Sequence, residues 1–185
     1  MPAWRFEPSE HFAVEGGTAT KTHAWEGRTA LGLPVLTAGR HVFHFVVEKL
    51  VYPDAHVFVG VAEEADSHCA AWGFNPPTGG LYIHKDRGAF GNDTRRKLMK
   101  DDLCGRQVGV PIEVRLDMDA KTLAFAVGGQ AQVDTGCMMP DSVRPYAHMC
   151  NEGDMVALYE GPAPSSSGLA RLTANRAGAP AAPVP

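Results

Sequence analysis

The sequence contains no long hydrophobic run: none of its apolar stretches approaches the roughly 20 residues that a membrane-spanning helix needs. It also lacks an excess of positive charge, because 17 lysines and arginines face 21 aspartates and glutamates and the formal net charge is -4. A domain that binds nucleic acid usually has a basic balance that neutralises phosphates. We therefore expect no membrane insertion and no nucleic-acid partner.

Cysteine is scarce, and its spacing is not that of a disulfide framework. The four cysteines, Cys69, Cys104, Cys137 and Cys150, lie far apart, and none forms a CxxC pair. Residues 1–11 alternate charged and aromatic side chains without the apolar core of a secretory signal. Since disulfides belong to oxidising compartments, we expect free thiols and an intracellular, cytoplasmic protein.

The histidines and cysteines also lack the spacing of a metal site. The nearest pairs are His84 with Asp86 and His148 with Cys150, in which alternate residues of a strand share a face. Neither pair is repeated to give the four ligands of a structural zinc site. Structural histidines and buried free cysteines are the favoured interpretation, and we expect no metal and no cofactor.

The sequence does contain many short apolar runs separated by turn residues. Its 185 residues include 20 glycines and 14 prolines, which fall between these runs as well as near the C-terminus. This pattern favours many strands joined by turns over a helical bundle. We predict one all-β domain over 11–161, an N-terminal arm over 1–10, and a flexible Pro/Ala/Ser-rich tail over 162–185.

Strand-like alternation recurs along the predicted domain, most clearly at 112–118, where even positions are apolar and odd positions are charged. We predict strands at 41–49, 57–62, 81–84, 112–118, 123–127, 130–133, 143–150 and 155–159. Gly128-Gly129 predicts a tight hairpin into 130–133, and the polar turn 151–154 predicts another. Gly60 within the run 57–62 implies a close neighbour. Only 93–103 has any helical character.

Several segments, in order along the chain, resemble the SPRY family. They are 39–43 (GRHVF), 59–62 (VGVA), 71–74 (AWGF), 79–82 (GGLY), 116–119 (LDMD), 122–125 (TLAF) and 143–146 (VRPY). The chain differs from the usual family pattern at Val42 and His44 and at the Gly128-Gly129 turn. The resemblance implies a two-sheet antiparallel β-sandwich, a concanavalin-like jelly roll, that binds a protein partner through loops at one edge and catalyses nothing.

Two groups of residues are candidates for contact with that partner. The segment 85–102 is rich in basic residues and could attract an acidic peptide or an acidic protein surface. The other group adjoins Pro76 and could supply aromatic anchors, although Trp72 also fits a packed position between sheets. The candidate binding residues are Trp72, Phe74, Asn75, Lys85, Arg87, Arg95, Arg96 and Lys97.

Three alternatives to simple partner binding follow from the same sequence. The tail could anchor the chain as a structural subunit of a large multi-subunit complex, such as a ciliary or cytoskeletal assembly. A lectin-like sandwich could bind carbohydrate. A glycoside hydrolase would need two carboxyl groups about 5 to 9 Å apart. Glu113 and Asp117 share a strand face but are separated by roughly 13 Å, so these carboxylates favour a solvent-facing role and we expect no enzyme.

Overall fold

The computed structural model describes residues 4–23, 27–52, 57–63, 71–75, 80–84 and 108–161, with 80–84 described by their backbone only. These residues form strands β1 (Arg5–Phe6), β2 (Phe12–Glu15), β3 (Thr18–Lys21), β4 (Arg28–Leu33), β5 (Arg40–Lys49), β6 (Phe58–Glu63), β7 (Ala71–Asn75), β8 (Gly80–His84), β9 (Pro111–Asp117), β10 (Thr122–Val127), β11 (Val133–Asp134), β12 (Val143–Met149) and β13 (Met155–Glu160). Among the described residues, none forms a helix with the length and apolar character that crossing a membrane requires.

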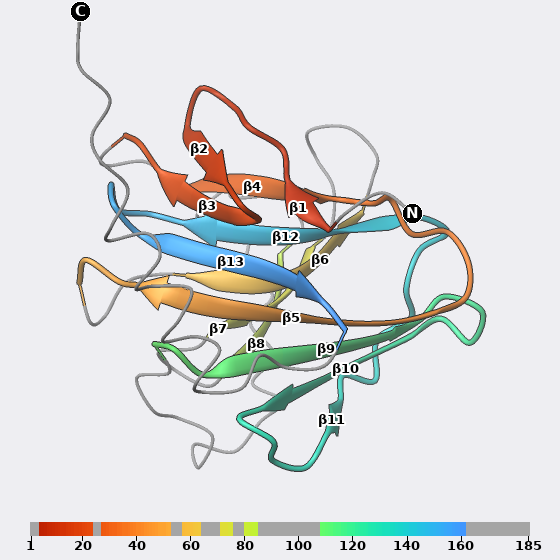
Figure 1. Cartoon of the computed structure of the whole chain (residues 1–185). Coiled ribbons are helices and arrows are strands. Elements are labelled where there is room, and N and C mark those ends of the chain that lie inside the picture. Colours follow the sequence, from red (N-terminus) through yellow and green to blue (C-terminus); the bar gives the residue numbers. More distant parts are fainter. Residues whose placement is uncertain are drawn as a thin grey trace, which may run out of the picture.

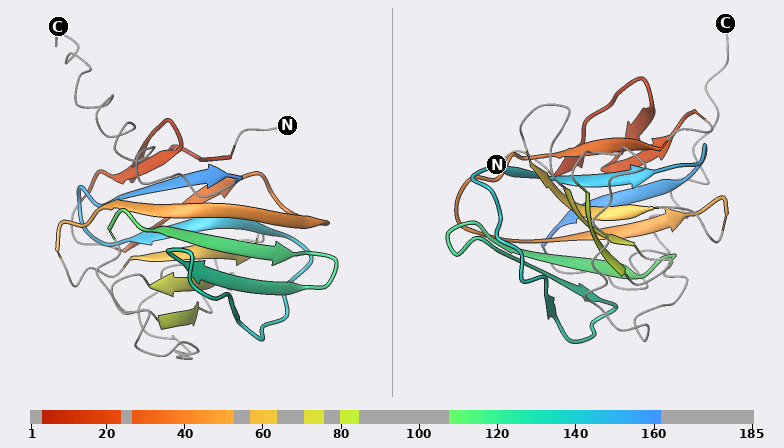
Figure 2. Two further views of the ribbon diagram at one scale, coloured as in Figure 1. Left: turned by 60° about the horizontal axis from the view of Figure 1, so that its bottom comes forward. Right: turned by 180° about the vertical axis from the view of Figure 1, so that it is seen from behind.

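The strands form two antiparallel sheets that pack face to face. One sheet has six strands in the order β1-β4-β12-β6-β7-β8, and the other has seven in the order β11-β10-β9-β5-β13-β3-β2. In Figure 1 the seven-stranded sheet lies in front, and Figure 2 shows the six-stranded sheet from behind. The predicted two-sheet β-sandwich is therefore confirmed.

Alternation along β5 and β9 explains how the core forms between the sheets. Phe43 and Phe45 on β5, and Ile112 and Val114 on β9, are fully buried in one hydrophobic cluster. The residues between them point away from the core, as the two-residue period of a strand requires. The strands predicted at 41–49 and 112–118 are thus confirmed, with bounds shifted by one residue.

The connection between β12 and β13 is not the predicted hairpin. β12 pairs with β4 and β6, whereas β13 pairs with β5 and β3, so residues 150–154 carry the chain from one sheet to the other. The fully buried Asp154 holds this crossing: its carboxylate accepts hydrogen bonds from the main-chain N–H groups of Val51 (2.9 Å) and Asn151 (3.0 Å). A turn signal alone does not distinguish a hairpin from such an arch, and the prediction was wrong here.

The strand predicted at 130–133 is shorter than expected. Gly128 and Gly129 do form a tight turn with positive φ angles of 57° and 78°, closed by a hydrogen bond from the Gln130 N–H to the Val127 carbonyl (3.0 Å). The chain then stays exposed until β11, where Val133 pairs with Phe125. Residues 130–132 have no large apolar side chain that would bring them onto the sheet.

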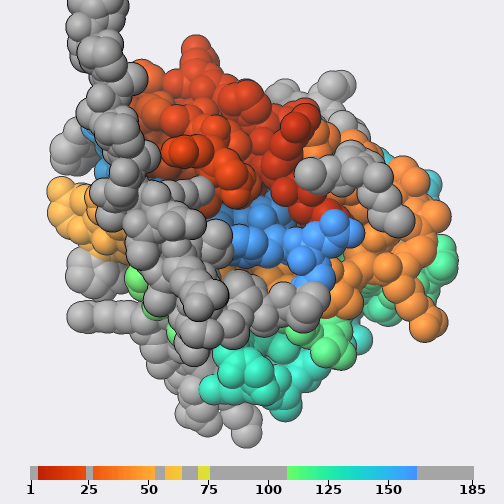
Figure 3. Space-filling model, viewed as in Figure 1, coloured from red at the N-terminus to blue at the C-terminus, as the bar shows by residue number. Residues whose placement is uncertain are grey.

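The N-terminal part of the chain contributes strands that no sequence pattern predicted. β1 lies within the segment 1–10 that was assigned to an arm, yet Phe6 is fully buried in the core and β1 pairs with β4. β2 and β3 form a hairpin, and β3 pairs with β13. Figure 3 shows this N-terminal region in red next to β13 in blue. These residues therefore pack as part of the sandwich.

Two glycines allow β6, β7 and β12 to pack closely. Gly60 faces Gly73 across β6 and β7, and Tyr146 of β12 pairs with Gly60 on its other side. A Cβ added to Gly60 would lie too close to the main-chain oxygen of Trp72, and one added to Gly73 would lie too close to Tyr146 Oη. Both separations would be well under 3.0 Å, the lower limit for Cβ contacts in real proteins. The expectation of a close neighbour at Gly60 is confirmed.

Candidate binding groove

The structure places the aromatic candidates in the interior. Trp72 is 8% exposed and Phe74 is fully buried, and both belong to the main hydrophobic cluster. The Phe74 ring stacks on Phe125 of the facing sheet with centroids 6.1 Å apart. Asn75 is also buried. These three residues stabilise the sandwich, and their side chains offer little surface to a partner.

The basic candidates cannot be placed in the same way. Lys85, Arg87, Arg95, Arg96 and Lys97, together with the helical character predicted at 93–103, lie outside the described residues, as does the tail over 162–185. Their predicted contact with an acidic partner stays a prediction.

His148 and Cys150, which were considered as metal ligands from their spacing and set aside, lie close together. Cys150 Sγ lies 3.7 Å from His148 Nε2, and His148 Nδ1 lies 3.2 Å from Thr29 Oγ1. Burial, followed by the nearby Asp154 carboxylate, raises the pKa of the Cys150 thiol to about 11. The thiol therefore stays protonated at neutral pH and is a poor nucleophile and metal ligand. Within the described ranges, no group of three or more His, Cys, Asp or Glu residues could hold a metal ion.

A groove lies on the outer face of the seven-stranded sheet, over β5, β9 and β10; we call it the outer groove. It consists of two adjoining hollows of about 440 Å³ and 300 Å³. The small side chains of Ala124 and Ala126 leave space along β10, and the β10–β11 loop with Gln130 and Gln132 forms one wall. Val42, 44% exposed, adds an apolar surface to the groove. The outer groove can therefore receive an extended chain.

Strand register brings complementary side chains together along this groove. Arg40 lies opposite Asp117 and His44 opposite Glu113 across β5 and β9. Arg40 Nε donates to Asp117 Oδ2 at 2.7 Å, and His44 Nε2 lies 3.2 Å from Glu113 Oε2. Arg115 also donates to Glu113. Two ion pairs, Arg40 with Asp117 and Arg115 with Glu113, thus lie along this surface.

Arg115 and Gln132 divide the outer groove into its two hollows. Arg115 on β9 donates through Nη1 to Gln132 Oε1 at 3.1 Å, although β10 lies between β9 and β11. Both residues line both hollows. Their hydrogen bond therefore lies at the boundary between the two hollows.

These contacts change the acidity of both carboxyl groups. Burial alone would raise the pKa of Glu113, but the hydrogen bonds from Arg115 and His44 outweigh it, and the pKa lies below its usual value. The pKa of Asp117 is also lowered, first by the Ala120 main-chain N–H and further by Arg40. Both side chains are therefore anionic at neutral pH.

The lowered pKa of Glu113 predicts acid sensitivity. A carboxyl group whose folded-state pKa lies below the unfolded value stabilises the fold above that unfolded value, here 4.5, and the contribution is lost as pH falls through the folded pKa. We expect the melting temperature of the wild type to fall more steeply below pH 4.5 than that of Glu113→Gln. Thermal melts across this range, with exposed Glu152→Gln as the matched control, measure the difference. Parallel curves for wild type and Glu113→Gln would contradict it.

Sequence reasoning found part of this site. The alternation at 112–118 placed Glu113, Arg115 and Asp117 on one solvent-facing side, and the structure confirms it. The contacts of Asp117 with Arg40 and of Glu113 with His44 were not predicted, because they depend on the register between β5 and β9, which no local pattern encodes.

Comparison with known proteins shows which solved structures share this fold. No family model and no curated protein sequence matches the chain. Among solved structures, the SPRY domain of human HERC1 superposes with a TM-score of 0.66 at 20% identity, over 85% of this chain and 99% of that one. A human SPRY domain gives 0.57 at 14% identity, over 83% and 98% of the two chains. The TRIM65 PSpry domain gives 0.58 at 15% identity, over 86% and 93%.

These likenesses define the chain first as an all-β sandwich domain of antiparallel strands. Within that class, its fold is the SPRY fold, and the likeness extends over most of this chain and nearly all of each matched domain. The fold implied by the sequence resemblance is thereby confirmed.

Proposed function

We propose that this protein is an interaction module that binds a segment of another protein in the outer groove and carries out no catalysis. The observation that carries the proposal is the pair of adjoining hollows, which share Arg115 and Gln132 in their linings, on a sheet face that also exposes Val42. A peptide lying there would meet charged and amide groups on its sides and small apolar side chains beneath it. The SPRY fold supports the same role, since SPRY domains generally bind proteins.

Selection of peptides tests this proposal directly. Random linear peptides displayed on phage would be selected on the domain, and the enriched sequences measured by fluorescence polarisation. We expect Arg115→Glu and Gln132→Ala to lower the affinity roughly tenfold or more, because they remove the charge and the amide shared by both hollows. Lys49→Glu, which changes an exposed lysine outside the outer groove, is the matched control.

The same peptides test the basic segment. The double change Arg95→Glu and Arg96→Glu should weaken acidic peptides if 85–102 contributes to binding. Unchanged affinity in this variant would remove the basic segment from the site and leave the groove in place. Enrichment of no peptide, or peptides indifferent to both groove variants, would contradict the proposal itself.

The alternatives stay predictions that other measurements separate. Binding on a glycan array would favour the carbohydrate-binding hypothesis. A fixed subunit of a ciliary or cytoskeletal assembly would co-fractionate with that assembly and lose the association when residues 162–185 are deleted.

A further inference from the structure

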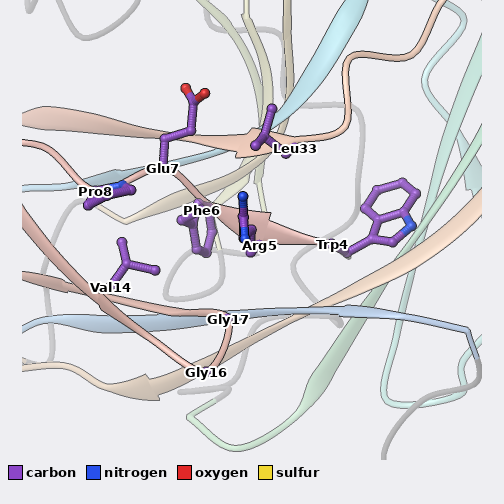
Figure 4. Close-up of a pocket in the computed structure, with 9 residues that line it drawn as sticks. All are labelled: Trp4, Arg5, Phe6, Glu7, Pro8, Val14, Gly16, Gly17 and Leu33. Carbon is purple, nitrogen blue, oxygen red and sulfur yellow. The ribbon is translucent and has the colours of Figure 1, made fainter. Parts of the chain in front are cut away.

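A second groove lies where the edges of the two sheets meet, away from the outer groove; we call it the edge groove. β1 is the last strand of the six-stranded sheet, and β2 is the last strand of the seven-stranded sheet. The space beside them, about 960 Å³, is lined by Trp4, Arg5, Phe6, Glu7, Pro8, Val14, Gly16, Gly17 and Leu33. Figure 4 shows β1 along one side and the Gly16-Gly17 turn on the other.

The main chain of Val14 points toward this groove. In an antiparallel ladder, residues alternate between pairs that exchange both hydrogen bonds and pairs that exchange none. The Thr22 N–H donates to the His11 carbonyl at 3.0 Å, so these two residues form a hydrogen-bonded pair. By the register of β2 with β3, Ala13 is then also a hydrogen-bonded position, and Val14 is a non-hydrogen-bonded one. The N–H and C=O of Val14 therefore face away from β3, toward the free edge.

Among the described residues, the outer side of β2 is paired at Phe12 but not at Val14. Ser9 pairs with Phe12 through two main-chain hydrogen bonds of 3.2 Å, so it occupies the outer side of β2 there. Toward its N-terminus, this segment leaves β2 and becomes β1, which pairs with β4 in the other sheet. Among the described residues, no strand pairs with β2 on that side at Val14. An extended chain could continue the ladder that Ser9 begins.

The side chains around this position indicate what kind of chain fits. Val14 and Leu33 are half-buried and give the groove its accessible apolar surface, and Val14 packs against the core cluster that contains the fully buried Phe6. Glu7 on the rim is already paired with Arg144. Arg5 is exposed, and no ion pair to it occurs within the described ranges. An aliphatic side chain suits this apolar surface, and a neighbouring carboxylate suits Arg5.

We propose that the edge groove binds an extended segment of another protein as an additional strand beside β2. The segment pairs with the main chain of Val14, places an aliphatic side chain beside Val14 and Leu33, and directs a carboxylate to Arg5. Addition of a strand to an open sheet edge takes affinity from main-chain hydrogen bonds and selectivity from alternate side chains. This site is separate from the outer groove and does not depend on it.

A peptide in which valine alternates with glutamate is the probe, and the same peptide with lysine in place of glutamate is its control. We expect the valine-glutamate peptide to bind the full chain in fluorescence polarisation and to slow hydrogen exchange at the Val14 amide. The valine-lysine peptide should bind at least roughly tenfold more weakly, because its charges oppose Arg5.

Three variants locate the binding. Arg5→Glu and Val14→Pro should each weaken the valine-glutamate peptide at least roughly tenfold, the second because proline removes an N–H that faces outward, where an edge strand tolerates it. Arg115→Glu should leave this affinity unchanged while weakening the peptides selected for the outer groove. Circular dichroism and melting temperature confirm that each variant is folded.

Several results would overturn the proposal. The proposal fails if the valine-glutamate peptide does not bind, or if its affinity is unchanged in Arg5→Glu and Val14→Pro. It also fails if Arg115→Glu abolishes the binding. Concentration-dependent protection of Val14 without peptide would assign the edge groove to a second copy of the chain. Protection that disappears on deletion of 1–3 or 162–185 would assign it to the chain's own ends.

Discussion

Replacing Gly60 with alanine should leave the domain largely unfolded under conditions in which the wild type is folded. The added Cβ would collide with the main-chain oxygen of Trp72 on the neighbouring strand β7, and a main-chain atom inside a sheet cannot move aside without breaking its ladder. We expect a loss of at least about 3 kcal/mol, the upper end of the usual cost of overpacking. Urea denaturation followed by far-ultraviolet circular dichroism measures it.

Gly73→Ala provides a matched comparison on the facing strand. Its Cβ would collide first with Tyr146 Oη, a side-chain atom that a second change can remove. Stability should therefore fall in Gly73→Ala and recover in part in the double variant Gly73→Ala/Tyr146→Phe, relative to Tyr146→Phe alone. If Tyr146→Phe rescued Gly60→Ala equally well, the collision with the main chain of Trp72 would not be the cause.

The second large effect is expected at Asp154, where the chain crosses between the sheets. Asp154→Ala removes the acceptor of the Val51 and Asn151 main-chain N–H groups at a site with no exposed surface. Two partly buried donors that lose their acceptor should cost about 2 to 3 kcal/mol, because water reaches them only in part. Urea denaturation should show the midpoint moving to a much lower concentration.

Asp119→Ala is the control for this prediction. Asp119 accepts a hydrogen bond from the Gly39 N–H at 2.9 Å, but in an exposed loop where water can replace the carboxylate. Its loss should cost about 1 kcal/mol or less. Equal costs at the two positions would contradict the role given to Asp154. In Asp154→Asn the pKa of Cys150 should fall, because the carboxylate contributes to raising it, and alkylation of the folded protein at a fixed pH should be faster.

The central strands could be predicted because their pattern is local. β9 alternates apolar and charged side chains, and β5 places Phe43, Phe45 and Val47 on one face; the structure buries both of these faces. β1 has only two residues, and β3 reads TATK, in which a single residue is aliphatic. Such segments become strands because neighbouring strands supply the pairing and burial, and a sequence pattern does not contain that information.

The candidate site was predictable only in part, for a related reason. The charged side of β9 follows from periodicity. The hydrogen bond from Arg40 to Asp117 does not, because it joins residues 77 positions apart. The hairpin predicted at 151–154 was wrong for the same reason. The turn residues were recognised, but which sheet β13 joins depends on its pairing with β5 and β3. Trp72 was given two roles by its sequence, and its exposure of 8% favours the packed one.

The pairing of β3 with β13 also has a consequence for synthesis on the ribosome. Thr18 and Thr20 near the start of the domain find their partners, Ala157 and Met155, only at its end, and β5 pairs with the same late strand. The seven-stranded sheet therefore cannot close until translation has passed residue 160 and the nascent chain has left the exit tunnel. Until then β2 and β3 have no sheet to join, and the early aromatic residues of the core stay uncovered.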